Sequence, residues 1–183
     1  MGHRLSKIYT RTGDAGTTGL GNGSRVEKDS VRMQVIGETD ELNSFIGSVL
    51  VQDVPDSVRE CLTDVQHALF DLGGELAVPD SETLSKDYVT ALEQALDNLN
   101  ADLPPLKEFI LPGGNAAAAA CHQARAVCRR VERRLVGLAR EERINEESRK
   151  YVNRLSDLLF VIARILARRS GGEVYWDPSR KRG

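Results

Sequence analysis

The stretch that decides the fold is FILPGGNAAAAACHQARAVCRRVERR, which runs from Phe109 to Arg134. A proline and two glycines interrupt the chain near its start, and the residues after them are mostly strong helix formers. Along the predicted helix, small or apolar residues recur at alternating steps of four and three, which is the spacing of a helix–helix contact. These residues are Ala117, Cys121, Ala124, Cys128, Val131, Leu135 and Leu138. One side of the helix is therefore predicted to lie in a core.

Arginines flank this contact face. At about 100° per residue, Arg125, Arg129 and Glu132 fall within about 60° of one another, and Arg133 lies further round the helix. Burying such a row costs free energy unless the guanidinium groups meet an anion. Two interpretations follow: a solvated face with surface ion pairs, or an anion site. The helix by itself does not decide between them.

Composition narrows the function classes. The chain has 183 residues, a net charge of −2 and 5% aromatic residues, so it lacks the basic field and the stacking platforms of a nucleic-acid-binding protein. Three cysteines without a CxxC pair indicate reduced thiols, and with three histidines they argue against a His/Cys metal centre. The sequence shows no run of about 18 apolar residues and no apolar signal region. We therefore expect no membrane association and a cytoplasmic location.

Apolar periodicity predicts an all-α fold of five helices. Besides the helix in the opening stretch, which is expected to end near Arg140, four more are expected. The first two cover 31–52 and 58–76. The third follows an N-cap at Ser85, and the last runs from near Glu146 to just before Gly171.

Less regular segments are expected at the edges of these helices. Gly73 and Gly74 are expected to fray the end of the second helix, and short strands are expected only over 7–10 and 173–176. The chain is predicted to be a single domain over 1–183. It would consist of a loop over 1–30, a helical bundle over 31–170 and a C-terminal tail over 171–183.

The N-terminal loop is rich in glycine, threonine and basic residues. The segment TRTGDAGTTGLGNGSRVEKD runs from Thr10 to Asp29, and such small residues expose N–H groups and hydroxyls that can wrap a polyphosphate. The loop contains neither a Walker A motif nor a GxGxxG turn between a strand and a helix. A disordered leader is the alternative, but Arg11, Arg25 and Lys28 among the threonines favour an anion-binding loop.

Two further polar residues are candidates. Asp40 lies in an acidic patch near the start of the first helix. It is either a helix-capping or exposed carboxylate, or the partner of a buried guanidinium such as that of Arg125. Asn153, on the last helix, carries an amide that can bond a nucleotide, although a single Asn is more often a surface residue. Local order indicates no Ser-His-Asp or Cys-His arrangement, and no carboxylate pair suited to acid hydrolysis.

Six blocks of sequence run in order along nearly the whole chain. They are YTRTGDAGTTGLG at 9–21, RVEKD at 25–29, GETDELNSFIG at 37–47, FILPGG at 109–114, ARAVCRRVER at 124–133 and YVNRLSDLLFVIAR at 151–164. Together they resemble the PduO-type ATP:cob(I)alamin adenosyltransferases. The resemblance implies a five-helix ferritin-like bundle with a Gly/Thr-rich N-terminal loop, assembled as a homotrimer with active sites between subunits.

The resemblance also implies a reaction and its residues. The adenosyl group of ATP would move to the cobalt of cob(I)alamin, leaving triphosphate, with Mg²⁺ mainly on the ATP phosphates. The residues that match ATP contacts are Thr10, Arg11, Thr12, Gly13, Thr18, Gly19, Lys28, Arg129, Arg130, Glu132, Arg133 and Asn153. Phe109 matches an aromatic residue that closes the lower face of cobalt, and Asp40 and Arg125 match a pair that bridges subunits near the corrin. Arg129, Asp40 and Arg125 would be the catalytic residues. A cobalamin reductase and an adenosylcobalamin-dependent enzyme would be partners.

This chemistry fits the residues of the chain. Cob(I)alamin is a nucleophile with no proton to remove, so the reaction needs no general base. Charge develops on the departing triphosphate, which fixed cations stabilise. Two alternatives remain open at this point: a non-catalytic helical module that binds nucleotide or cobalamin and delivers it, and a structural oligomer whose arginine row is only surface.

Overall fold

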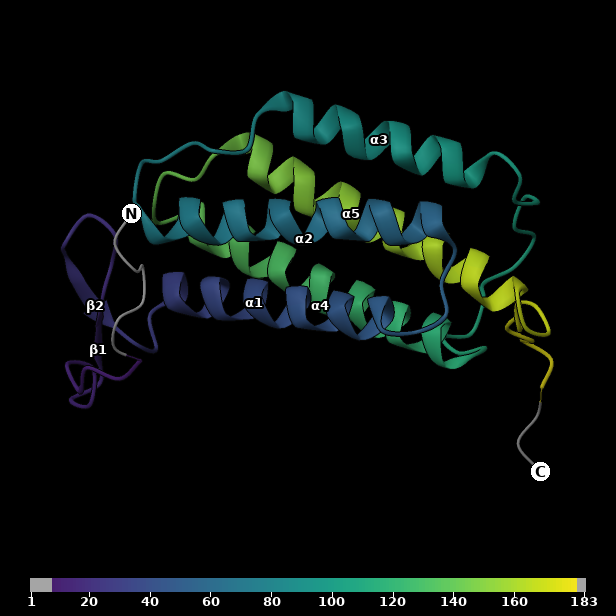
Figure 1. Cartoon of the computed structure of the whole chain (residues 1–183), viewed down its shortest axis with the longest axis horizontal. Helices are drawn as coiled ribbons and strands as arrows, with labels where there is room; N and C mark the ends of the chain where they lie inside the picture. The colour runs from purple at the N-terminus through teal and green to yellow at the C-terminus, as the bar shows by residue number, and fades with distance from the viewer. Residues whose placement is uncertain (1–7, 181–183) are drawn as a thin grey trace.

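Five helices make up most of the described part of the chain. The computed structural model describes residues 8–180, with α1 (Val31–Leu50), α2 (Asp56–Ala77), α3 (Lys86–Asn100), α4 (Ala116–Leu138) and α5 (Glu146–Arg168). They lie side by side in an elongated bundle, with α3 on the outside and packed against α5 (Figure 1). The predicted all-α bundle of five helices is confirmed.

Side-chain caps fix where four of these helices begin. Ser30, Ser85, Asn115 and Asn145 each accept a hydrogen bond from a backbone N–H in the first turn of the helix that follows. The helix α2 begins after Pro55 without a side-chain cap. The predicted cap at Ser85 is therefore confirmed, and α1 and α4 each end two residues before the predicted positions.

The contact face predicted on α4 is buried. Its seven small or apolar residues are each at most 6% exposed, and α4 packs against both α1 and α5. The thiols of Cys121 and Cys128 donate to the carbonyls of Leu159 and Val152 at 3.2 and 3.3 Å. Small side chains on α4 thus bring its backbone close to α5, which matters because both helices carry predicted site residues.

The sequence predicts that α2 frays at its two glycines, and this prediction is wrong. It continues through Gly73 and Gly74 to Ala77. The reason is burial: Leu72 and Leu76 are at most 1% exposed, and burying each contributes about 1.5–3 kcal/mol. That gain exceeds the roughly 1 kcal/mol that a glycine costs inside a helix.

Buried polar contacts stabilise the end of the bundle where α2 ends and where the loops before α3 and α5 lie. Glu75 Oε2 accepts hydrogen bonds from the N–H of Thr83 at 2.7 Å and from Asn145 Nδ2 at 3.0 Å. Arg32, which is 4% exposed, pairs with Glu142 at 2.5 Å. Glu75 and Arg32 therefore both have polar partners, and the loops before α3 and α5 are fixed to the helices.

The strands differ from the prediction. An antiparallel hairpin joins β1 (Thr17–Gly19) to β2 (Arg25–Glu27) inside the glycine–threonine loop, where the sequence predicts no strand. Its turn contains Gly23 at a φ of 86°, which glycine adopts without strain. Residues 8–10 form no strand, and Lys7 lies outside the described residues. In place of a strand over 173–176, Tyr175 forms one antiparallel bridge with Ile110.

Candidate functional site

A basic hollow lies on the solvent side of α4. Its volume is about 400 Å³, and the residues that line it are Arg129, Glu132, Arg133, Val136 and Arg140. Within residues 8–180, none of these three arginines has a carboxylate within ion-pair distance. Three guanidinium groups beside one carboxylate leave an excess of positive charge. The hollow therefore favours an anion.

Neighbouring arginines on the same helix are paired instead. Arg130 hydrogen-bonds Glu41 and lies 3.6 Å from Glu38, which also lies 3.4 Å from Arg134. The hydrogen bond that Arg130 donates to Glu41 raises the pKa of Arg130. These pairs tie α4 to α1, and Arg130 does not line the hollow. Its predicted contact with ATP stays a prediction.

The helix α5 reaches the hollow through Asn153. Its Nδ2 atom donates to Oε1 of Glu132 at 2.6 Å, so two predicted ATP contacts from different helices lie together. Val136 and Arg140 also line the hollow, and the sequence analysis missed them. The sequence does contain a signal for these two residues. Positions 129, 133, 136 and 140 recur at steps of four and three, so they share one helix face.

Arg25 organises the N-terminal loop. Its Nη2 atom donates to the carbonyl of Thr12 at 2.8 Å and to Oγ1 of Thr17 at 2.7 Å. One guanidinium thus joins the start of the loop to the hairpin. The sequence analysis treated Arg25 only as one of several basic residues, because the hairpin that gives it this position was not foreseen.

Other predicted loop residues lie close to one another. A Cβ atom at Gly13 would lie 3.0 Å from Nζ of Lys28, so glycine allows the lysine to cross this backbone. The hydroxyls of Thr10 and Thr12 are 2.9 Å apart, and Arg11 has a φ of 61°, which is uncommon for a residue with a side chain. The loop therefore presents hydroxyls and cations together.

The loop and the hollow are separate in one chain. None of the loop residues 8–30 lines the hollow on α4. The hairpin extends beyond the start of α1 at one end of the bundle (Figure 1), and the N–H of Gly21 donates to the carbonyl of Ala77 at 2.7 Å. The predicted ATP residues thus form two groups, one on the loop and one on α4 and α5.

Asp40 and Arg125 do not pair within the described chain. Asp40 is exposed on α1, and Arg125 lies 6.0 Å from the ring centre of Phe160. Burial, followed by the positive charge of Arg129, lowers the pKa of Arg125. Its buried Nε has no hydrogen-bond partner among residues 8–180. An unsatisfied buried donor costs free energy, so this guanidinium is suited to a partner from outside the described chain.

Phe109 lies on a loop that pairs with the C-terminal tail. The N–H of Leu111 donates to the carbonyl of Val174 at 2.8 Å, and the N–H of Trp176 donates to the carbonyl of Phe109 at 2.7 Å. Several large apolar side chains of this loop–tail unit are exposed, Phe109 by 78% and Trp176 by 47%. Exposed apolar side chains gathered in one place are typical of a binding surface.

A buried ion pair anchors this tail. The carboxylate of Glu173 is 1% exposed and lies 2.5 Å from Nε of Arg164, which is 5% exposed. A second arginine, Arg168, lies 2.9 Å from the same carboxylate. The sequence analysis gave residues 171–183 no role, because a pairing between a tail and a loop far away in the sequence leaves no local pattern.

Residues 8–180 contain neither a metal-binding cluster nor a membrane-spanning helix. These residues contain no group of three or more His, Cys, Asp or Glu side chains able to hold a metal ion. No described helix combines the length and the apolar character needed to cross a membrane. The fold and the hollow define a helical bundle with a basic face that is suited to an anion.

Comparison with known proteins identifies the family. The family model for cobalamin adenosyltransferase matches residues 8–166. The chain is 57% identical to a cobalamin adenosyltransferase of Cupriavidus metallidurans, over 99% of this chain and 100% of that protein. It is 46% identical to a corrinoid adenosyltransferase of Bacillus subtilis, over 94% and 93% of the two chains.

A solved structure that is similar to this chain points to the same family. It is a phenylalanine-to-alanine variant of a PduO-type ATP:corrinoid adenosyltransferase from Lactobacillus reuteri, complexed with cobalamin and ATP. The two chains superpose with a TM-score of 0.85 at 35% identity, over 93% of this chain and 99% of the other. The chain belongs to the cobalamin adenosyltransferase family.

Proposed function

We propose that this chain transfers the 5′-deoxyadenosyl group of ATP to the cobalt of cob(I)alamin, forming adenosylcobalamin and releasing triphosphate at the hollow on α4. Family membership supports the reaction. The observation that supports its location is the set of arginines without carboxylate partners, Arg129, Arg133 and Arg140.

The chain's residues act by charge and position. The electron pair of cob(I)alamin forms the bond to C5′ of the ribose, while the bond from C5′ to the triphosphate oxygen breaks and that oxygen keeps its electron pair. No proton moves, so no general base is needed. Negative charge grows on the leaving oxygen, and the fixed guanidinium of Arg129 stabilises it without having to reorganise. Asn153 and Glu132 hold ATP beside it.

The complete ATP site lies between two subunits of a homotrimer. In one chain the loop residues do not line the hollow, so the loop of a neighbouring subunit supplies the second half of the site. The residues it supplies are Thr10, Arg11, Thr12, Gly13, Thr18, Gly19 and Lys28. Asp40 is exposed and Arg125 has an unpartnered Nε, which fits an ion pair between subunits. Arg130 also contacts ATP, and it fixes α4 to α1.

The corrinoid binds at the loop–tail unit. Phe109 closes the lower face of cobalt and keeps an axial ligand away, which favours four-coordinate cobalt that is easier to reduce. Its exposed ring and the exposed Trp176 offer apolar surface to the corrin. Asp40 and Arg125 contact the corrinoid from the interface between subunits.

The residues of the hollow fit a Mg²⁺ ion that is carried mainly by ATP. Such ions take one or two carboxylates together with the substrate phosphates, and Glu132 supplies the one carboxylate of the hollow. Bound there, the ion would neutralise part of the triphosphate charge. The guanidinium groups of Arg129 and Arg133 neutralise the remainder.

We extend the proposal to the cellular setting. The chain works in the cytoplasm as one domain over residues 1–183, with an ATP-binding loop, a helical bundle and a tail. A cobalamin reductase supplies the reduced substrate, and an adenosylcobalamin-dependent enzyme takes up the product.

An anaerobic assay tests the proposal. The full chain is mixed with chemically reduced cob(I)alamin, ATP and Mg²⁺, and the product is followed by its visible spectrum while triphosphate is measured separately. We expect adenosylcobalamin and triphosphate in equal amounts over many turnovers. Binding of both substrates without turnover would instead make the chain a delivery module.

A further inference from the structure

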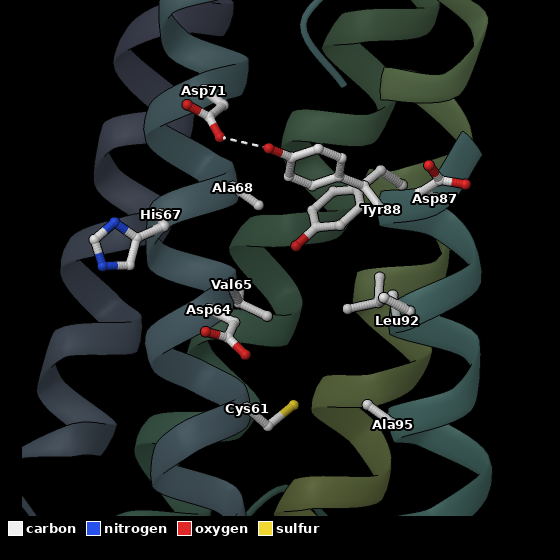
Figure 2. Close-up of a pocket in the computed structure, with 12 residues that line it drawn as sticks. Cys61, Asp64, Val65, His67, Ala68, Asp71, Asp87, Tyr88, Leu92 and Ala95 are labelled. Atoms are coloured by element: carbon white, nitrogen blue, oxygen red, sulfur yellow. Dashed lines mark hydrogen bonds between the residues drawn. The ribbon is translucent and has the colours of Figure 1, made fainter. Parts of the chain in front are cut away.

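A second cavity lies on the other side of the bundle, between α2 and α3. Its volume is about 500 Å³, and it shares no residue with the hollow on α4. Figure 2 shows Val65 and Ala68 of α2 facing Leu92 and Ala95 of α3 across it. A cavity of this size with apolar walls suits a small molecule.

The polar groups of the cavity are mainly acidic. Asp64 and Asp71 lie on α2 and Asp87 lies at the start of α3. Among residues 8–180 none of the three has an ion-pair partner. Asp71 accepts a hydrogen bond from the hydroxyl of Tyr88 at 3.0 Å, as Figure 2 shows. His67 is the one basic side chain that lines the cavity, so its field is negative and attracts cations.

The hydroxyl of one tyrosine that lines the cavity has no hydrogen-bond partner within residues 8–180. Tyr151 of α5 is 2% exposed and lines the cavity, and its hydroxyl makes no hydrogen bond to any residue in 8–180. Burial raises its pKa far above the ordinary value, and burial raises the pKa of Cys61 nearby to about 11. Both groups therefore stay neutral at pH 7, and the Tyr151 hydroxyl remains available to bond water or a ligand in the cavity.

The same tyrosine supplies aromatic surface. The rings of Tyr88 and Tyr151 pack edge to face, with centres 6.4 Å apart and planes at 77°. Aromatic faces attract an ammonium group, most strongly where water is excluded. The cavity between α2 and α3 is thus lined by carboxylates, aromatic rings, a hydroxyl without a partner in residues 8–180, and apolar side chains.

We propose that this cavity binds a small organic cation, in which an ammonium group is carried on an apolar aryl or alkyl body. The body contacts Val65 and Leu92, and the ammonium group meets Asp64 and the hydroxyl of Tyr151. An anion is excluded by the three carboxylates. A metal ion is disfavoured, because Asp64 and Asp71 are seven residues apart on one helix and so about 10 Å apart along its axis.

Calorimetry with two matched probes tests this proposal. The probes are 2-phenylethylamine, which is a cation at pH 7, and 2-phenylethanol, which has the same body without the charge. Titrated into the full chain with saturating ATP, the amine is expected to bind at least tenfold more tightly than the alcohol. Its affinity should fall as salt is added. Equal affinities, or no binding of the amine at millimolar concentration, would overturn the proposal.

Variants locate the probe. Asp64→Asn should weaken amine binding at least fivefold, whereas Asp97→Asn, an exposed aspartate of α3 that does not line the cavity, should leave it unchanged. Ala95→Leu fills the cavity and should weaken both probes at least tenfold. Melting curves identify any variant that does not fold, and Tyr151→Phe then provides an independent test by removing only the hydroxyl. Equal losses for Asp64→Asn and Asp97→Asn would place the amine elsewhere.

Discussion

Replacing Glu173 with glutamine tests how the C-terminal tail holds the loop that carries Phe109. The carboxylate is 1% exposed and its partner Arg164 is 5% exposed. Removing one charge of a buried pair leaves the other unpaired, at a cost of about 3–5 kcal/mol. Glutamine keeps the shape and Arg164 keeps its bond to the carbonyl of Pro104 at 2.7 Å, so we expect about 3 kcal/mol. That loss lowers the melting temperature by about 6–12 °C.

Two measurements separate the anchor from a general loss of stability. Urea unfolding gives the free energy, and hydrogen exchange reports the amides of Leu111 and Trp176, which bond the tail and the loop to each other. These amides should exchange faster in Glu173→Gln than amides of α4. Glu82→Gln breaks a pair with Arg143 whose side chains are 54% and 74% exposed, so it should cost less than about 1 kcal/mol. Equal costs for the two variants would refute the reasoning.

The same pair predicts a dependence on pH. Burial raises the pKa of Glu173, but hydrogen bonds from Arg164 and Arg168 outweigh burial and bring the pKa below its usual value. A lowered pKa in the folded state stabilises the fold fully above the pKa of the unfolded chain, about 4.3, and this contribution is lost as the pH falls through the folded value. The stability difference between the native chain and Glu173→Gln should therefore be constant near neutral pH and shrink below about pH 4.

Four further measurements each test a single residue. Gly114→Ala should cost about 1–3 kcal/mol, because φ is 98° and the new Cβ would lie 3.2 Å from that of Ala167. Gly137→Ala, a helical glycine with open space around it, should be neutral or stabilising by urea unfolding. Burial raises the pKa of Cys61 to about 11, so iodoacetamide should label it slowly at pH 7.5 and quickly after denaturation, as read by mass spectrometry; rapid labelling of the folded chain would contradict this. Asp40→Asn should weaken assembly in ultracentrifugation and raise the KM for cobalamin, while the melting temperature stays unchanged. If assembly and KM are both unchanged, Asp40 does not lie in the interface.

Most of the fold could be predicted because its signals are local. The spacing from Ala117 to Leu138 predicts a buried face on α4, and the face is buried. Caps such as Ser85 are also local signals. The end of α2 could not be predicted, because Gly73 and Gly74 break a helix by propensity, and only the burial of neighbouring leucines in the assembled core overrides that cost.

The candidate site could be predicted in part. The arginine row on α4 follows from helical spacing, whereas only the family resemblance predicts that Asn153 of α5 shares a site with it. The structure brings Glu132 and Asn153 to a hydrogen bond. Long-range contacts leave no such pattern. The bond from Arg25 to Thr12, the bridge between Ile110 and Tyr175, and the cavity at Tyr151 all join segments far apart in the sequence.

The most direct test of the proposed reaction is the turnover of Arg129→Ala with cob(I)alamin and ATP, measured beside its melting temperature. Arg129 is exposed and has no ion pair within residues 8–180, so the fold should lose little. Loss of a group that stabilises developing charge should lower kcat by about 10²–10³-fold. Arg143→Ala, an exposed arginine outside the hollow, is the matched control and should keep full turnover. A melting temperature that falls in step with kcat, or full turnover in Arg129→Ala, would contradict the assignment of the hollow to the triphosphate.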